Sequence, residues 1–215
     1  MSVMFPRWTN LVPLAIAAVV IVAVPTATLA AWYWFSPEFT DVGYRPVQPI
    51  PFSHELHAGQ LGMDCRYCHN TVERSGYAAV PPVQTCMNCH AVVKTDSAKL
   101  APLREAWKSG EAIRWKRVHM LPDYCYFNHS VHVAAGVGCV SCHGRIDQMK
   151  VVQQSKPLSM GWCLSCHRNP GPNLRPVSQV TNMAYDAKAA AYDPASDPLR
   201  KRQPDPPKHC SGCHR

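Results

Sequence analysis

The chain has few of the features from which a protein of its length normally builds a hydrophobic core. Only 17% of its 215 residues are charged, 20 are proline, and outside one apolar run near the N-terminus few long segments show helical or strand periodicity. A chain of this length would ordinarily form one or two domains around an apolar core. We therefore expect part of the apolar interior to come from something other than side chains.

Cysteine and histidine are abundant by contrast, with 11 of each, and ten of the cysteines fall into five copies of the pattern C-x-x-C-H. Zinc sites combine C-x-x-C pairs into sets of four ligands, which would leave one of the five copies unmatched. Redox dithiols and disulfides do not require a histidine after the second cysteine. The pattern instead predicts five covalently bound haems c, each held by two thioethers and by the adjacent histidine as proximal iron ligand. The predicted attachment residues are Cys65, Cys68, Cys86, Cys89, Cys139, Cys142, Cys163, Cys166, Cys210 and Cys213, and the predicted proximal ligands are His69, His90, His143, His167 and His214.

Five porphyrins would supply the apolar interior that the side chains do not. The expected fold class is a multihaem cytochrome c, mainly irregular, with short α-helices and proline-rich loops wrapped round a haem stack, plus one N-terminal transmembrane helix. Folding should then depend on haem attachment, as it does in small domains that are held together by a metal.

The N-terminal apolar run, residues 11–35, contains 25 residues without a charge. This exceeds the roughly 20 residues that an α-helix needs to span a bilayer. Trp8 and Trp32 would lie about 36 Å apart along a helix, so they could mark both membrane interfaces. A cleaved signal peptide is the alternative, with residues 28–30 as the cleavage signal. We expect an uncleaved single-pass anchor in the bacterial cytoplasmic membrane, with Arg7 inside and the haem region on the periplasmic side.

The net charge of +8 could indicate a nucleic-acid partner or an anionic membrane surface. Five haems would add ten propionates, which brings the charge to about −2 when all irons are ferrous and about +3 when all are ferric. We therefore expect the basic side chains to face propionates, and we expect no nucleic-acid partner.

An internal repeat divides the chain. The pattern F-x-H-x-x-H occurs at Phe52–His57 and again at Phe127–His132, each time followed by two C-x-x-C-H motifs, at an offset of 75 residues. The repeat predicts two dihaem modules. The expected organisation is a cytoplasmic N-terminus (1–10), a transmembrane helix (11–35), a linker (36–51), dihaem module 1 (52–95), a linker helix and strand (96–126), dihaem module 2 (127–170), and a proline-rich wrap with the fifth haem (171–215).

The linker between the modules has the one clear helical pattern outside the anchor. Asp96 or Ser97 could cap a helix that Gly110 ends. Its apolar face would contain Leu100, Leu103 and Trp107, a stripe that favours packing over function. Residues 113–118 are expected to form a short extended segment.

The repeated histidines are the candidate distal ligands. Two imidazoles three positions apart lie on one face of a helical turn, close enough to serve two neighbouring irons. This predicts His54, His57, His129 and His132 as distal ligands. For the fifth haem we expect His119, with Met120, Met160, Met183 and His209 as alternatives. Cys125 has no disulfide partner once the other ten cysteines hold haem, and we expect an inert thiol rather than a reactive or lipidated one.

Several segments carry a family resemblance: PVQPIPFSHELHAGQLGMDCRYCH, PPVQTCMNCHAVVK, RVHMLPDYCYFNHSVHVAAGVGCVSCHGR and LSMGWCLSCHRNP. Together with the anchor and the terminal CSGCHR, they resemble the membrane-anchored pentahaem cytochrome c subunit of alternative complex III, a bacterial quinol-oxidising complex. The resemblance implies haem attachment at the five motifs and distal ligation by the paired histidines. It also implies partner subunits: an iron-sulfur/molybdopterin-like subunit, polytopic quinol-binding subunits and a monohaem cytochrome c.

The expected function is electron transfer. If every iron has two protein ligands, no coordination position remains for a substrate, so the chain would relay electrons from quinol oxidation in partner subunits to a monohaem cytochrome or a soluble acceptor. One alternative is a subunit of a related membrane-anchored quinol dehydrogenase or menaquinone reductase, and a more distant one is a catalytic multihaem reductase. Haem order, potentials, quinone type and final acceptor stay open at this point.

Overall fold

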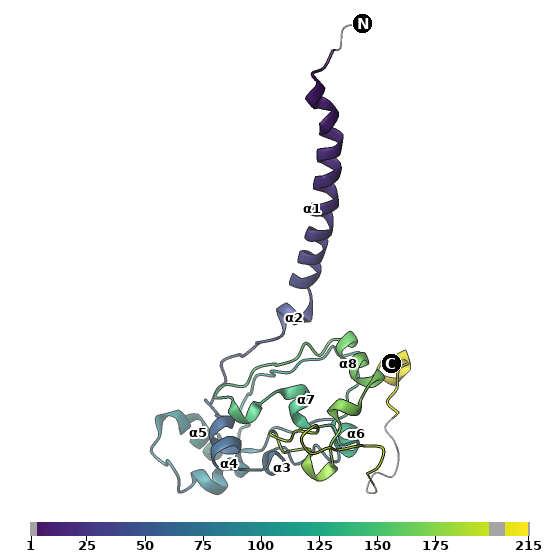
Figure 1. The fold of residues 1–215 in the computed structure, drawn as a ribbon. Coiled ribbons are helices and arrows are strands. Elements are labelled where there is room, and N and C mark those ends of the chain that lie inside the picture. The colour runs from purple at the N-terminus through teal and green to yellow at the C-terminus, as the bar shows by residue number, and fades with distance from the viewer. Residues whose placement is uncertain (1–3, 198–204, 215) are drawn as a thin grey trace. The chain divides into compact units, whose positions relative to one another are not determined.

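The computed structural model describes residues 4–197 and 205–214. The chain divides into two compact units, Met1–Asp41 and Val42–Arg215 (Figure 1). The first three residues of the predicted cytoplasmic N-terminus, and residues 198–204 and 215 of the predicted proline-rich wrap, lie outside the described part of the chain.

The first unit contains the 3-10 turn η1 (Arg7–Leu11), the long helix α1 (Val12–Trp34) and the short helix α2 (Pro37–Thr40). Pro13 lies in the first turn of α1, where no intrahelical N–H bond is lost. Pro25 lies inside the helix, and just after it the hydroxyls of Thr26 and Thr28 donate back to the carbonyls of residues 22 and 24. The most apolar 18-residue window of the stretch Arg7–Trp34 has a mean hydropathy of 2.4, and the stretch is long and apolar enough to cross a membrane.

The second unit consists of short helical segments joined by long irregular ones, as Figure 1 shows. Its described residues form no β-strand, only the isolated bridges Cys125–His214 and Val137–Leu174. This confirms the expected mainly irregular fold. The helical segments are the π-helical turn η2 (Glu55–Gln60), α3 (Cys65–Cys68), α4 (Val83–His90), η3 (Ala98–Leu100), α5 (Ala101–Ser109), α6 (His129–Ala134), α7 (Cys139–His143), η4 (Ile146–Gln148), α8 (Met160–Arg168), η5 (Gly171–Asn173), η6 (Val177–Gln179) and η7 (Cys210–Gly212).

The linker helix forms as α5, preceded by η3, and ends where Gly110 takes the left-handed conformation at φ +75°. Leu103 is its buried residue, at 2% exposure, and α5 packs against α4. The segment 113–118 forms no strand, because no second extended segment pairs with it in the described chain. The side chain of Gln48 instead bonds both main-chain groups of Lys116, at 2.8 and 2.9 Å.

The apolar core of the described residues is small for a unit of this size. Its buried apolar side chains are Ile50, Leu103, Val133, Leu174, Val180 and Met183. A close approach of the main chain adds to this core. A Cβ at Gly59 in η2 would clash with the carbonyl oxygen of Asp147 in η4, so only glycine allows these two turns to pack. Side-chain packing of this extent contributes little to holding long irregular segments in place.

A polar contact ties the C-terminal segment to the first C-x-x-C-H motif. Asp64 caps α3 by accepting from the main-chain N–H of Arg66 at 2.8 Å, and it also accepts from the Arg66 guanidinium at 2.9 Å. Its second oxygen accepts from the hydroxyl of Thr181 at 3.0 Å. The hydrogen bond with Arg66 lowers the pKa of Asp64 from 3.8 to about 2.

Removing this charge should change how stability depends on pH. A carboxyl whose pKa is lower in the folded than in the unfolded state stabilises the fold above pH 3.8, and this contribution is lost as the pH falls through about 2. Because the Asp64 side chain is 43% exposed, solvent screening should hold the effect of Asp64→Asn below about 1 kcal/mol. We expect denaturant unfolding of the haem-loaded protein to show the variant as less stable at pH 6 and equal to the parent near pH 2. A difference that persists undiminished at pH 2 would contradict the assignment.

Candidate functional site

Each C-x-x-C-H motif begins a short helical segment or lies within one: the five are in α3, α4, α7, α8 and at η7. One helical turn brings both cysteines of a motif to the same side and places the histidine directly after them. Local caps fix two of these turns, since Asp64 accepts from Arg66 at the start of α3 and Ser159 accepts from Trp162 at the start of α8. None of the ten motif cysteines takes part in a disulfide.

Four histidine rings of the F-x-H-x-x-H repeats face four motif histidines at nearly constant separation. In both modules the first histidine of the repeat faces the first motif and the second faces the second motif. The ring centroids are 6.5 Å apart for His54 and His69, 6.3 Å for His57 and His90, 6.4 Å for His129 and His143, and 6.2 Å for His132 and His167.

This separation fits an iron ion between each pair of rings. A bond between a metal ion and an imidazole nitrogen is about 2 Å long and the ring centre lies roughly 1 Å beyond that nitrogen, so two imidazoles on opposite sides of one iron have centres roughly 6 Å apart. Rings in direct contact can lie at similar separations, so the recurrence of nearly the same separation in all four pairs, each beside a C-x-x-C-H motif, is what favours an iron. The four pairs therefore fit bis-histidine haem, with a cysteine pair next to each.

The phenylalanine of each repeat holds both of its histidines. The Phe52 ring lies 4.8 Å from that of His54 and 4.3 Å from that of His57, and Phe127 contacts His129 and His132 at 4.7 and 4.5 Å. Both phenylalanines belong to the repeated F-x-H-x-x-H pattern, so the sequence shows that they recur with the histidines. It does not show that each phenylalanine contacts both candidate distal ligands of its repeat.

Main-chain carbonyls orient most of these rings through Nδ1. A ring whose Nδ1–H donates to a carbonyl leaves the Nε2 lone pair free to bind a metal. Among the distal candidates, His57, His129 and His132 donate to the carbonyls of Ser53, Gly76 and Asn128 at 2.7 to 2.8 Å. Among the proximal candidates, His69, His90, His167 and His214 donate to the carbonyls of Ala79, Val93, Pro207 and Tyr124 at 2.7 to 3.2 Å. The sequence gives no sign of these carbonyl partners, because they depend on how the loops return to the motifs.

Burial keeps the rings of His143 and His54 neutral. Burial and, to a smaller extent, neighbouring histidines lower the pKa of His143 to about 3 and that of His54 to about 4. Neutral imidazole is the form that binds a metal, so protons do not compete for these two ligands at neutral pH.

The fifth motif has different surroundings. The ring that contacts His214 is that of Tyr124, at 5.6 Å between centroids, and the main chain of Cys125 and Tyr126 runs beside residues 213–214. Burial and the neighbouring Cys213 raise the pKa of Cys125, which makes its thiol less reactive and supports the expected inert role.

The candidates for the fifth distal ligand are spread over the second unit. The His119 ring packs against His143, at 4.4 Å between centroids, so these contacts give no support to ligation of the fifth haem by His119. Met183 is buried, His209 is exposed, and Met120 and Met160 are 51% and 67% exposed.

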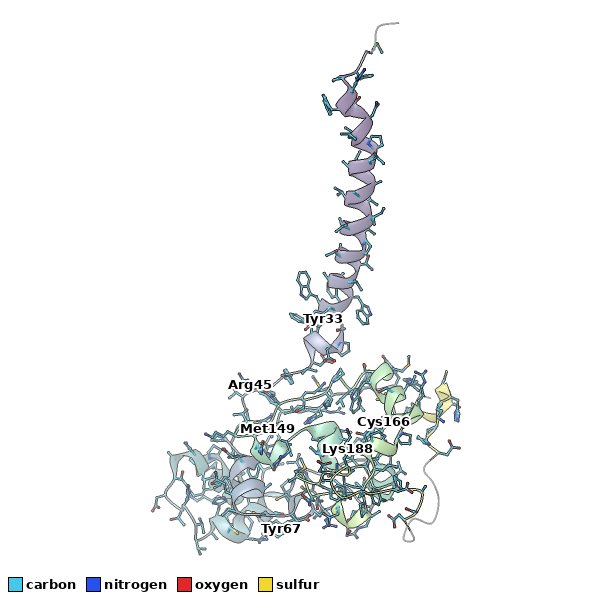
Figure 2. The ribbon with its side chains drawn as sticks, in the orientation of Figure 1. Tyr33, Arg45, Tyr67, Met149, Cys166 and Lys188 are labelled. Carbon is cyan, nitrogen blue, oxygen red and sulfur yellow. The ribbon has the colours of Figure 1, made fainter. Side chains whose placement is uncertain are left out.

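Cysteines of different motifs lie next to one another. The Cys139 thiol and burial raise the pKa of Cys65, so the first and third motifs are neighbours. Burial, with a nearby thiol of another motif, raises the pKa of three further cysteines: Cys68 near Cys86, Cys142 near Cys166, and Cys163 near Cys125 and Cys213. These neighbours link the second motif to the first, the third to the fourth and the fourth to the fifth. Figure 2 shows Tyr67 of α3 and Cys166 of α8, which belong to the first and fourth motifs, at well-separated places.

Comparison with known proteins identifies two similarities. Residues 56–144 match the family model described as cytochrome c3. Over 128 residues the chain is 33% identical to the protein named menaquinone reductase, multihaem cytochrome c subunit, from Nitratidesulfovibrio vulgaris. The aligned region covers 59% of this chain and 59% of the length of that relative.

Proposed function

We propose that this chain, a multihaem cytochrome c with a cytochrome c3-like domain, is the electron-relay subunit of a membrane quinol-oxidising complex of the alternative complex III type. The observation that carries this proposal is the set of four histidine ring pairs at 6.2 to 6.5 Å. Two protein imidazoles on one iron fill both axial positions, which excludes substrate. Covalently bound haem supplies one-electron redox chemistry, and the histidines keep it free of bond-making steps.

Five haems would be held by the ten motif cysteines and the five motif histidines, with His54, His57, His129 and His132 as distal ligands. In this relay the second and fifth sites would lie at the ends, an arrangement that the neighbouring cysteines support. The first and third sites, linked by Cys65 and Cys139, connect the two dihaem modules, 52–95 and 127–170. The fifth site, within 171–215, is then one of the two at which electrons could leave or enter.

The membrane side of the proposal rests on residues 11–35, which would anchor the chain once across the bacterial cytoplasmic membrane. Residues 36–51 would connect the anchor to the haem region on the periplasmic side. The expected partners are polytopic quinol-binding subunits, an iron-sulfur/molybdopterin-like subunit and a monohaem cytochrome c that accepts electrons.

The similarity to a menaquinone reductase subunit favours one second candidate. In that case the same relay would belong to a complex that reduces quinone, and electrons would run in the opposite direction. The histidine pairs support both candidates equally, because bis-histidine sites pass electrons either way.

Purification of the chain from native membranes in mild detergent, with identification of the bound subunits, tests the proposal. We expect a polytopic subunit and a monohaem cytochrome c to co-purify, and anaerobic addition of quinol to reduce the haems. Haems that are reoxidised by menaquinone but not reduced by quinol would favour the second candidate. A lone cytochrome that responds to neither, or one whose spectrum changes when nitrite or hydroxylamine binds, would contradict both.

A further inference from the structure

One proximal histidine differs from the other four in what holds it. His69, His90, His167 and His214 each have Nδ1 on a main-chain carbonyl, whereas Nδ1 of His143 lies 3.3 Å from Nε2 of His119. We propose that His119 is a positioning residue that accepts a hydrogen bond from His143 and thereby sets the reduction potential of the haem at the third motif. This inference rests on the proposed haem attachment there, and it replaces the ligand role expected for His119.

The geometry of the two rings supports a hydrogen bond rather than shared ligation. His143 turns its other side toward His129, with centroids 6.4 Å apart and planes within 13° of parallel. The His119 ring meets His143 edge-on, at 78° and 4.4 Å, which is too near for a metal to lie between their centres. With Nε2 kept for the proposed iron shared with His129, His143 would carry its proton on Nδ1 and donate it to His119.

The loop that carries His119 is fixed by a buried glutamine. The side chain of Gln154, which is 2% exposed, accepts from the main-chain N–H of Met120 at 3.4 Å. Its own main chain bonds residues 43 and 44 at 2.8 and 3.0 Å. On the other side of the contact, the hydroxyl of Ser155 donates to the carbonyl of His143 at 3.1 Å. The adjacent residues Gln154 and Ser155 thus hold the loop of His119 and the main chain of His143.

A hydrogen-bond acceptor on Nδ1 changes the reduction potential of a haem whose iron is bound by Nε2 of the same ring. A group that accepts from Nδ1–H makes the ring a stronger donor to the metal, which favours the oxidised state and lowers the potential. Four of the five motif histidines obtain this effect from carbonyls, which no substitution removes. At His143 a side chain supplies it, in the middle of the proposed relay, so this potential can be changed by mutation without changing a ligand.

Two substitutions that differ by one methylene test the proposal in the full-length, haem-loaded protein. His119→Gln presents an amide oxygen about as far from the main chain as Nε2, whereas His119→Asn is too short to reach Nδ1 of His143. His119→Phe keeps the ring against His143 and has no acceptor. Haem content by mass spectrometry, spin state by electron paramagnetic resonance and potentials by spectroelectrochemical titration are measured for each.

We expect every variant to keep the haem count and the spin states of the parent. In the Asn and Phe variants one haem should be easier to reduce by roughly threefold to tenfold in its equilibrium constant, the scale of one hydrogen bond, and the Gln variant should resemble the parent. Equal potentials in the Asn and Gln variants, or a new high-spin haem that binds cyanide, would overturn the proposal. If the phenylalanine variant does not accumulate, the Asn and Gln pair decides. A parent protein with fewer than five haems would instead count against the proposed function.

Discussion

A chain that is exported without haem attachment is expected to lose most of its ordered structure beyond Asp41. The described residues of the second unit bury only six apolar side chains, and long irregular segments connect their helical turns. Four of those turns, α3, α4, α7 and α8, have nine residues or fewer, and helices this short are not stable alone in water. Covalent haem and its two axial histidines would supply both the missing apolar contact and the cross-links between segments.

Far-UV circular dichroism and limited proteolysis compare the haem-loaded protein with a variant in which all ten motif cysteines are replaced by alanine. We expect the variant to lose most of the helical signal that does not come from α1, and to be cut within the second unit at protease concentrations that leave the parent intact. A version lacking only Cys125, which is outside the motifs, serves as the matched control and should behave like the parent. A cooperative unfolding transition in the haem-free variant would show that side chains suffice.

The sequence predicts the contents of each haem site better than the order of the sites. Motif cysteines, proximal histidines and the two F-x-H-x-x-H patterns are local in the chain, and one helical turn determines which side chains lie together. The internal repeat extends this, because a pairing in one module implies the same pairing in the other. His54 and His57 therefore face motif histidines just as His129 and His132 do.

The features that the sequence does not predict depend on contacts between distant segments. Cys65 and Cys139 are neighbours only because the two modules pack in one particular way, and spacing along the chain does not predict that packing. The His119 and His143 contact depends on how residues 117–120 run past Gln154. His119 was a candidate ligand because it and His209 are the only two histidines outside the C-x-x-C-H motifs and the F-x-H-x-x-H repeats. Its contact with the ring of His143 is visible only in the three-dimensional structure.

Replacing His132 by alanine is expected to convert one low-spin haem in five to a high-spin haem that binds cyanide. The ring of His132 faces His167 at 6.2 Å, and it is oriented by the carbonyl of Asn128 at 2.7 Å and by the ring of Phe127. On the proposed ligation, alanine would remove the sixth ligand and leave a pocket beside the iron, where water or an added anion can bind. The other haems should keep their spectra, because no ligand proposed for them is changed.

The same helix provides the controls for this experiment. Val131 lies next to His132 in α6 but is 56% exposed, so Val131→Ala shortens a side chain of the same turn without removing a ligand. His132→Met keeps a sixth ligand of another kind, so all haems should stay low-spin while one becomes easier to reduce. Electron paramagnetic resonance and cyanide titration distinguish the three variants. An alanine variant in which all haems stay low-spin and exclude cyanide would mean that His132 is not an axial ligand, and the constant ring separation would then need another cause.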